Sequence, residues 1–372
     1  MSNNKKFKWQ RVVIKVGSAL IAPQRNGVSS RYLLGIAQFI VRCRAMGVQV
    51  VLVSSGSVAA GSHLFPDAEN PSIAIKKAMA AAGQTEMIGI WNNLFDFPTA
   101  QILMTHGDLR DRERYVSVKQ TLVNLLKNGI LPIVNENDTV TTDKLKVGDN
   151  DNLSAMVAAA ADADVLIICS DVDGLYDKNP RKHPDAKLIR WVSHIDESTY
   201  AMAGSDTGIM GTGGMRTKVE AAEKATSHGI DTFIINGFSE TSFNQLIDGV
   251  NPGTHFQSVD KPMTEHLHWM TYTSDAQGEV IVADDFEFDL NLQSELLTSD
   301  KIMQVKGDFT VGDTILVRKR NGIKLAKAKS NYSSCLLGFI ADQENHQGNT
   351  SNQSTGPIIS SQNVAMLDHS NQ

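Results

Sequence analysis

The order of three segments, RVVIKVG (residues 11–17), SRYLLGIAQFIVRCRAMG (30–47) and VQVVLVSSG (48–56), decides the fold class. The first and third segments are short and apolar, which is typical of buried strands. The second has apolar residues at helical spacing and ends in glycine, as amphipathic helices often do. The sequence therefore begins with strand–helix–strand alternation.

The same alternation continues through the first 250 residues. Further helices are predicted at 75–95, 113–129, 152–163 and 215–229, and further strands at 100–105, 130–138, 164–171 and 231–237. We therefore expect an α/β fold in which a mostly parallel sheet is sandwiched by helices. Ligands of such sheets bind beyond the C-terminal strand ends, so functional residues are expected directly after the strands.

From residue 278 the sequence changes to short strands, and KRNGIK (319–324) carries an Asn-Gly hairpin signal. We expect a small all-β domain at 278–368, a first domain at 1–258 and a polar, proline-containing linker at 259–277. The composition of 345–356 predicts a polar loop.

Charge and cysteine content exclude several classes of protein. The 372 residues carry a net charge of −6, so the chain has no general cationic coat for nucleic acid. Three scattered cysteines exclude a disulfide scaffold and a thiolate zinc site, and they are typical of a reducing compartment. There is neither a signal-peptide core after the N-terminal lysines nor a run of 18 apolar residues. We expect a cytoplasmic protein without a membrane segment.

Two polar motifs follow the first two strands. Lys15 lies near the end of the first strand, where a lysine is costly unless its charge is used. Its ammonium group either extends to solvent or contacts a phosphate. In the second case, Gly17 would allow the phosphate to approach the backbone closely. VSSGSVAAG (53–61) either caps a helix or offers N–H and hydroxyl donors to an anion. It is not a nucleophile elbow, because the glycine two places before the serine is absent.

The densest polar cluster is formed by VNENDTV (134–140) and VGDNDNLSA (147–155). Each loop alone could be explained by solvation or helix capping. Together, their acids and amides suit a zwitterionic substrate, because carboxylates bind an ammonium group and amides bind a carboxylate.

Two further motifs are candidates for a nucleotide site. CSDVDGLYDKNP (169–180) follows an apolar strand, and GTGGMRTK (211–218) is glycine-rich and opens a helix. A glycine loop at a helix N-terminus can hold phosphate, although this one lacks the ending of a Walker A loop. The ten histidines show no zinc-ligand spacing.

As a set, IKVGS (14–18) and the five motifs above resemble the amino-acid kinase family over residues 9–250, and in particular its glutamate 5-kinase branch. Residues 278–368 resemble a PUA domain, a small β-barrel. Ser360 and Ser361 stand where that domain usually has a His-Arg pair, which argues against RNA binding.

The resemblance implies ATP-dependent phosphorylation of the L-glutamate side-chain carboxylate to glutamyl 5-phosphate, the first step of proline biosynthesis. It also implies ATP and Mg²⁺ as cofactors, feedback inhibition by proline and a homo-oligomer. No protein ligand to a metal is expected, because Mg²⁺ would be held through ATP.

The resemblance further implies roles for individual residues. The predicted catalytic residues are Lys15, Asp151 and Lys218. The predicted glutamate-binding residues are Ser55, Asn135, Asp138, Asp149 and Asn150. The predicted ATP-binding residues are Lys15, Ser170, Asp171, Thr212, Gly213, Gly214, Met215, Arg216, Thr217 and Lys218.

Three alternatives remain at this point. The acceptor could be aspartate, acetylglutamate, carbamate or UMP, as in other kinases of the family. The chain could bind RNA through the basic run 301–329, although the adjacent acidic run 279–300 opposes this. It could also be a regulatory sensor with a degraded site, which the intact lysines and acids argue against.

Overall fold

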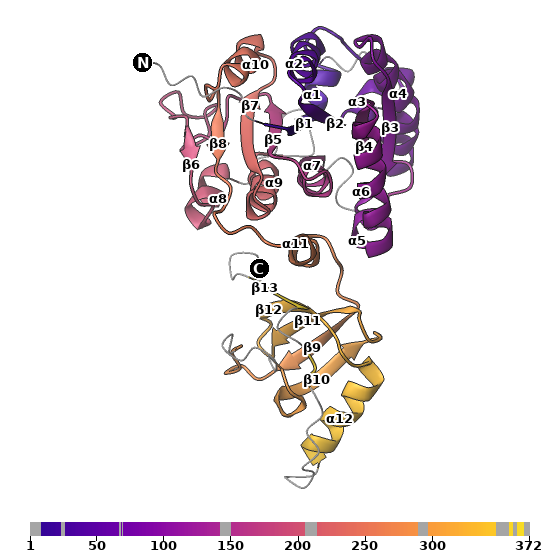
Figure 1. Ribbon diagram of the computed structural model, residues 1–372, viewed down its shortest axis with the longest axis vertical. Helices are drawn as coiled ribbons and strands as arrows, with labels where there is room; N and C mark the ends of the chain where they lie inside the picture. The colour runs from indigo at the N-terminus through magenta and orange to yellow at the C-terminus, as the bar shows by residue number, and fades with distance from the viewer. Residues whose placement is uncertain are drawn as a thin grey trace. The chain divides into compact units, whose positions relative to one another are not determined.

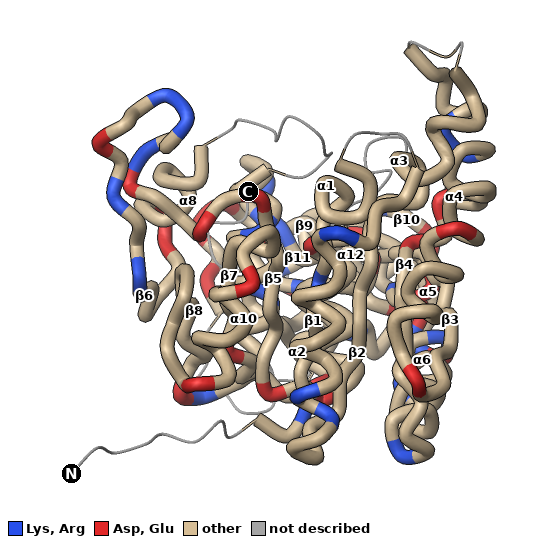
Figure 2. Tube along the Cα trace, turned by 90° about the horizontal axis from the view of Figure 1, so that it is seen from above, with Lys and Arg blue, Asp and Glu red and all other residues tan. Residues whose placement is uncertain are grey.

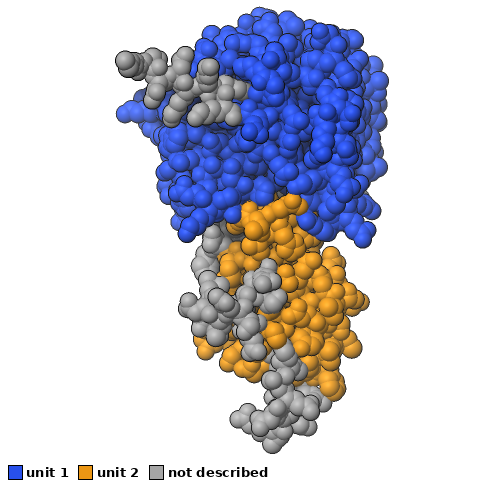
Figure 3. All heavy atoms as spheres, viewed as in Figure 1, with its two compact units in different colours: residues 1–262 blue, residues 263–372 orange. Residues whose placement is uncertain are grey.

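The computed structural model describes residues 9–23, 27–66, 68, 70–141, 150–204, 214–288, 297–346, 357–359 and 363–367. The chain divides into two compact units, residues 1–262 and 263–372, which are coloured separately in Figure 3. Within the described residues, no helix combines the length and apolar character needed to cross a membrane.

An eight-stranded sheet forms the centre of the first unit, in the order β3-β4-β2-β1-β5-β7-β8-β6 (Figure 1). Its strands are β1 (Arg11–Val16), β2 (Gln49–Ser54), β3 (Thr99–Met104), β4 (Leu131–Glu136), β5 (Val165–Ser170), β6 (Trp191–Val192), β7 (Asp231–Asn236) and β8 (Thr254–Phe256). Neighbouring strands are parallel except β7 and β8, which confirms the predicted mostly parallel sheet. The short strands β6 and β8 were not predicted.

Helices cover both faces of this sheet (Figure 1). One face packs against α2 (Leu33–Ala45), α4 (Ile73–Asn93) and α10 (Glu240–Ile247). The other packs against α6 (Arg112–Lys127), α7 (Asn150–Ala160) and α9 (Met215–Ser227). The unit also contains α1 (Ser18–Ile21), α3 (Ser57–Gly61), η1 (Ser62–Leu64), α5 (His106–Arg110) and α8 (Glu197–Ala203).

The alternation of β1 decides where its lysine points. Val12, Ile14 and Val16 belong to the apolar core that also contains residues of α2, α4 and α10. Because successive side chains of a strand point to opposite faces, Lys15 lies on the face that packs against α7. The lysine therefore faces the start of a helix rather than the apolar core.

Helices α3 and α4 approach each other at two glycines. A Cβ atom on Gly83 of α4 would overlap the backbone oxygen of Ser57 and the backbone nitrogen of Gly61, both in α3. Only glycine allows the two backbones to lie this close. The contact places the residues beside Gly83 against the C-terminal edge of the sheet, where α3 follows β2.

Replacing Gly83 by alanine is expected to destabilise the first unit by about 3 kcal/mol, because the new methyl group meets backbone atoms that cannot move aside. Gly89→Ala, in the same helix, is the matched control, since a Cβ atom there meets nothing within 4 Å. The control should stabilise the unit by about 0.5–1 kcal/mol. Denaturant unfolding curves give both values, and equal shifts for the two variants would contradict the close helix contact.

The second unit contains a five-stranded sheet in the order β10-β9-β11-β12-β13. Its elements are α11 (Glu265–Tyr272), β9 (Gly278–Val282), η2 (Ser299–Lys301), β10 (Ile302–Gly307), β11 (Thr314–Lys319), β12 (Lys324–Lys329), α12 (Ser334–His346) and β13 (Val364–Met366). The sheet agrees with the predicted small β domain, to which the structure adds the unpredicted helix α12.

The segment predicted as a linker, 259–277, contains α11. The Nζ atom of Lys327 on β12 donates to the carbonyl oxygens of Thr271 and Ser274 at the end of this helix. Residues 263–277 thus belong to the second compact unit. Ser360 and Ser361 lie outside the described residues, as does most of the predicted loop at 345–356.

Candidate active site

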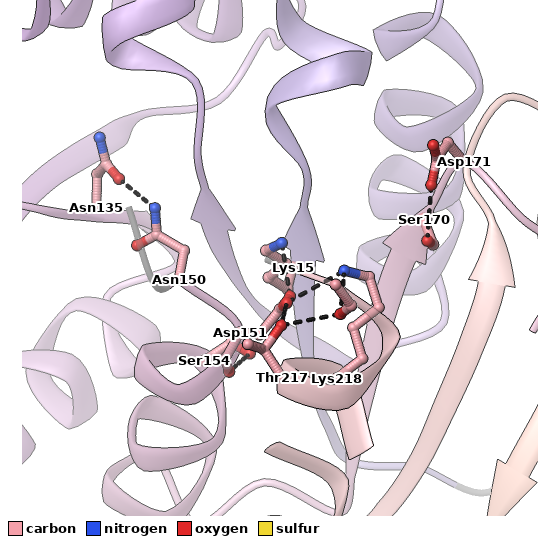
Figure 4. A network of polar contacts seen from close by, with 10 residues as sticks. Lys15, Asn135, Asn150, Asp151, Ser154, Ser170, Asp171, Thr217 and Lys218 are labelled. Carbon is pink, nitrogen blue, oxygen red and sulfur yellow. Dashed lines mark hydrogen bonds and ion pairs between the residues drawn. The ribbon is translucent and has the colours of Figure 1, made fainter. Parts of the chain in front are cut away.

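Two lysines and one aspartate form a buried cluster at the C-terminal edge of the sheet (Figure 4). The Nζ atom of Lys15 on β1 lies 2.7 Å from Oδ1 of Asp151, in the first turn of α7. The Nζ atom of Lys218 on α9 lies 3.1 Å from Oδ2 of the same carboxylate. The exposed fractions of Lys15, Asp151 and Lys218 are 6%, 2% and 9%. One carboxylate thus directs two ammonium groups from different elements to one place.

Burial and charge act on the Asp151 carboxyl in opposite directions. Burial by itself raises its pKa, but the charges of Lys15 and Lys218 outweigh burial, helped by hydrogen bonds from Lys15 and Thr217. The result is a pKa well below the ordinary range, so Asp151 stays ionised. Two positive charges and one negative charge leave the cluster with a net positive charge, which suits an anionic ligand.

At the start of α9, Thr217 supports this arrangement, whereas the helix dipole acts against the charge of Lys218. Lys218 lies in the first turn of the helix, where a cation opposes the helix dipole. The Thr217 hydroxyl lies 2.7 Å from Oδ2 of Asp151 and 2.9 Å from the carbonyl oxygen of Gly214. Asp151, in contrast, lies in the first turn of α7, where the dipole favours a negative charge.

Amide side chains lie on one side of the cluster (Figure 4). Asn150 donates through Nδ2 to Oδ1 of Asn135, at 2.9 Å. Three buried atoms of the predicted glutamate-binding residues have no hydrogen-bond partner among the described residues: Ser55 Oγ, Asp138 Oδ1 and Asn150 Oδ1. Because buried polar atoms are nearly always hydrogen-bonded, this group indicates a site for a polar ligand.

Asp138 is anchored from α3. The Ser57 hydroxyl donates to Oδ2 of Asp138 at 2.8 Å, and Oδ1 has no partner in the part of the chain that the structure describes. Burial raises the pKa of this carboxyl, and the hydrogen bond from Ser57 opposes the rise only in part. An ammonium group would restore the preference for the ionised form.

A cavity of about 330 Å³ is lined by Lys218 and by residues that follow β5. Its lining includes Ser170, Asp171, Gly214 and Met215, which the sequence predicts as ATP-binding residues. Ser170 and Asp171 lie on the side of the cluster away from Asn135 and Asn150 (Figure 4). Lys218 therefore belongs both to the charged cluster and to the cavity.

The segment between β5 and β6 forms much of the cavity wall. It carries basic residues, and these are visible as blue stretches leading to β6 in Figure 2. Two of them, Lys178 and Arg181, line the cavity, and Arg181 Nη2 lies 2.5 Å from Oδ2 of Asp171. Sequence reasoning noted the motif at 169–180 but assigned only its first polar residues. Sequence reasoning also missed residues 201–204 at the end of α8, which line the cavity but form no recognisable motif.

The remaining predicted residues separate into two groups. Arg216 is more than half exposed, lies near Glu220 at 3.4 Å and stands over the ring of Tyr200, so its side chain does not join the cluster. Asp149, Thr212 and Gly213 lie outside the described residues. Sequence reasoning also missed Gln84 of α4, whose Oε1 accepts from Asn135 Nδ2 at 2.8 Å.

Comparisons with known proteins show to which family the chain belongs. Residues 10–236 match the model of the amino acid kinase family. "Glutamate 5-kinase 1" of Pseudoalteromonas translucida is 62% identical over 98% of this chain and 100% of its own length. "Glutamate 5-kinase" of Idiomarina loihiensis is 54% identical over 90% of this chain and 91% of its own. A solved structure of UMP kinase from Bacillus anthracis is 17% identical, with a TM-score of 0.49, over 68% of this chain and 97% of that chain. The family match and the two glutamate 5-kinases show that this chain belongs to the amino acid kinase family and, within it, to the glutamate 5-kinases.

Proposed function

We propose that the Lys15–Asp151–Lys218 cluster is where this chain transfers the γ-phosphate of ATP to the side-chain carboxylate of L-glutamate. The chain is an ATP-dependent kinase, and its product is glutamyl 5-phosphate, the first intermediate of proline biosynthesis. One observation carries the proposal. The two ammonium groups meet at a single carboxylate, between unpartnered buried polar atoms and a cavity.

The reaction must bring two anions together. A carboxylate oxygen of glutamate attacks the γ-phosphorus, and the bond from that phosphorus to the β-phosphate oxygen breaks. Because no covalent bond to the protein is needed, positioning and charge neutralisation supply the catalysis. Lys15 and Lys218 are assigned the role of neutralising charge on the phosphoryl group during its transfer. Asp151 holds both lysines in place.

Glutamate and ATP are assigned to opposite sides of this cluster. Ser55, Asn135, Asp138 and Asn150 hold glutamate, with the Asp138 carboxylate facing its ammonium group. Ser170, Asp171 and the start of α9 hold ATP in the adjacent cavity. These assignments are supported by the unpartnered buried atoms on the first side and by the cavity lining on the second.

Magnesium accompanies ATP in this reaction. Across the described segments, no group of three or more His, Cys, Asp or Glu side chains could hold a metal ion. The proposal assigns Mg²⁺ to the phosphate oxygens of ATP, which together with water and one or two carboxylates are its usual ligands at kinase sites. Bound with ATP, it would neutralise part of the phosphate charge.

A trapping experiment tests the proposed function. Purified protein is incubated with ATP, Mg²⁺, hydroxylamine and one acceptor from a panel of L-glutamate, L-aspartate, N-acetyl-L-glutamate, carbamate and UMP. We expect hydroxamate formation with L-glutamate, together with equimolar ADP, because hydroxylamine attacks acyl phosphates. Faster turnover with another acceptor, or ADP release without hydroxamate, would contradict the proposal.

Replacing Asp138 by asparagine is expected to raise KM for glutamate by about 10- to 100-fold, because a hydrogen bond between charged groups contributes roughly 1.5–3 kcal/mol. The KM for ATP should change less than threefold. In the unmodified protein, affinity for glutamate should fall as the pH drops through the raised pKa of Asp138, because the neutral acid no longer attracts ammonium. The variant should lack this pH dependence. Equal losses of affinity for glutamate and ATP would refute the assignment.

Four further assignments rest on family resemblance. We propose that proline inhibits the enzyme, that the chain forms a homo-oligomer, that it works in the cytoplasm, and that residues 278–368 are a PUA domain. Adding proline to the trapping assay tests the first, and light scattering of the purified protein tests the second.

A further inference from the structure

We propose that Gln84 of α4 is a positioning residue that helps to hold the Asn150 amide with its oxygen toward the substrate. The proposal rests on the function above, in which Asn150 binds glutamate. It departs from the expectation that amides bind the carboxylate, because it assigns the Asn150 oxygen to the α-ammonium group beside Asp138. Gln84 is separated from Asn135 by 51 positions in the chain, and no sequence motif marks it.

The hydrogen-bonded amides of Gln84, Asn135 and Asn150 are called the relay below. It begins at a backbone N–H group that cannot turn. The backbone N–H of Glu136 donates to Oδ1 of Asn135 at 2.9 Å. Glu136 ends strand β4, so this N–H has a set direction. A donor requires an acceptor opposite it, and therefore Oδ1 rather than Nδ2 of Asn135 must face Glu136.

That choice determines the two neighbouring amides. With Oδ1 of Asn135 so placed, Nδ2 faces Gln84 and donates to its Oε1 at 2.8 Å. Asn150 meets the same Oδ1 and must present its Nδ2, at 2.9 Å. The Oδ1 atom of Asn150 is then turned away from the relay, where it is buried and has no hydrogen-bond partner within the described segments.

The resulting orientation of the Asn150 amide suits the ammonium group of the substrate. A free oxygen on Asn150 accepts from an ammonium group, and the unpartnered Oδ1 of Asp138 is a second acceptor for it. If Asn135 turned over, Asn150 would have to present an N–H to the substrate, which repels ammonium. Gln84 opposes this reversal because its Oε1 accepts from Asn135 Nδ2, and this hydrogen bond would be lost unless the buried Gln84 amide turned over as well.

The three amides are held rigidly enough for this task. Gln84, Asn135 and Asn150 are all at least nine-tenths buried. Gly83, directly before Gln84, permits the close approach of α4 to α3. Helix α3 also carries Ser57, which anchors Asp138. Both acceptors assigned to the ammonium group thus depend on the same pair of helices.

The test compares L-glutamate with glutarate, which has both carboxylates but no ammonium group. The measured quantity is the ratio of kcat/KM for glutamate to that for glutarate, from hydroxamate formation. In Gln84→Met this ratio is expected to fall about tenfold, while KM for ATP and kcat/KM for glutarate stay within about threefold. Gln245→Met, an exposed residue on α10, is the matched control and should leave the ratio unchanged.

A purely structural role for Gln84 would lower kcat/KM for both acids equally, and an unchanged ratio would overturn the proposal. Gln84→Glu keeps an oxygen opposite the Asn135 amide and should hold the ratio within about threefold of the unmodified protein. A loss as large as that of Gln84→Met would overturn the role given to Oε1. If the unmodified protein forms no hydroxamate with glutamate, the proposed function fails instead. Calorimetric affinities of Gln84→Met for the two acids then test the relay alone.

Discussion

Replacing Lys218 by alanine is expected to lower kcat by about 100- to 1,000-fold, with a smaller effect on KM for glutamate. Removing one preorganised donor from a developing negative charge typically costs this much, roughly 2.7–4 kcal/mol. Lys218 qualifies because it is buried, is oriented by Asp151 and lines the cavity assigned to ATP. Its charge therefore acts where water contributes little screening.

Steady-state kinetics with saturating ATP and glutamate measure the effect. Lys224→Ala is the matched control, because Lys224 lies in the same helix but donates to Asn152 and is absent from the cavity lining. Its kcat should stay within about threefold of the unmodified protein. A kcat for Lys218→Ala within threefold of the unmodified protein would show that Lys218 does not stabilise the transferring group, since even 1.4 kcal/mol is tenfold.

Replacing Asp151 by asparagine should affect stability and turnover together. Two buried ammonium groups would lose their shared counter-charge, and breaking a buried ion pair from one side costs about 3–5 kcal/mol. Turnover should fall at least as far as in Lys218→Ala, because both lysines lose the group that orients them. Denaturant unfolding and kinetics on the same preparation measure the two effects.

The pH dependence of this stability has a definite sign. The folded-state pKa of Asp151 is lowered, so its stabilising contribution is complete above the unfolded-state value of about 3.9. The contribution is lost only as the pH falls below that value toward the folded-state pKa. The stability difference between the unmodified protein and Asp151→Asn should thus be constant from about pH 5 to 8 and shrink in stronger acid. A difference below about 1 kcal/mol at pH 7 would contradict the shared-carboxylate arrangement.

The strands that carry the site were predictable because each is a distinct apolar run followed by polar residues. β1, β2, β4 and β5 fall where the sequence places strands, and the site follows their C-terminal ends. β6 and β8 were missed because two or three residues are too few to show a period. Helix α12 was missed because its segment lies among short strands in a region whose turns and strands predicted an all-β domain.

Side-chain partners were harder to predict than elements. The adjacent serines after β2 show why: Ser54 accepts from Trp91 Nε1 in the core at 3.0 Å, whereas Ser55 lies among the unpartnered site atoms. Family resemblance indicated that Lys15, Asp151 and Lys218 are catalytic. Spacing alone could not show that they meet, because 67 positions separate Asp151 from Lys218. Gln84 gave no signal at all, since its role depends on the direction of three amides in the folded chain.

The most direct test of the account is a crystal structure of the protein with ADP, Mg²⁺, L-glutamate and a planar fluoride mimic of the transferring phosphoryl group. The account predicts that the Nζ atoms of Lys15 and Lys218 both lie about 2.7–2.9 Å from the mimic, as charge-assisted donors do. The glutamate side-chain carboxylate should lie on the opposite side of the mimic from ADP. A mimic bound away from Asp151, or contacted by neither lysine, would contradict the central claim.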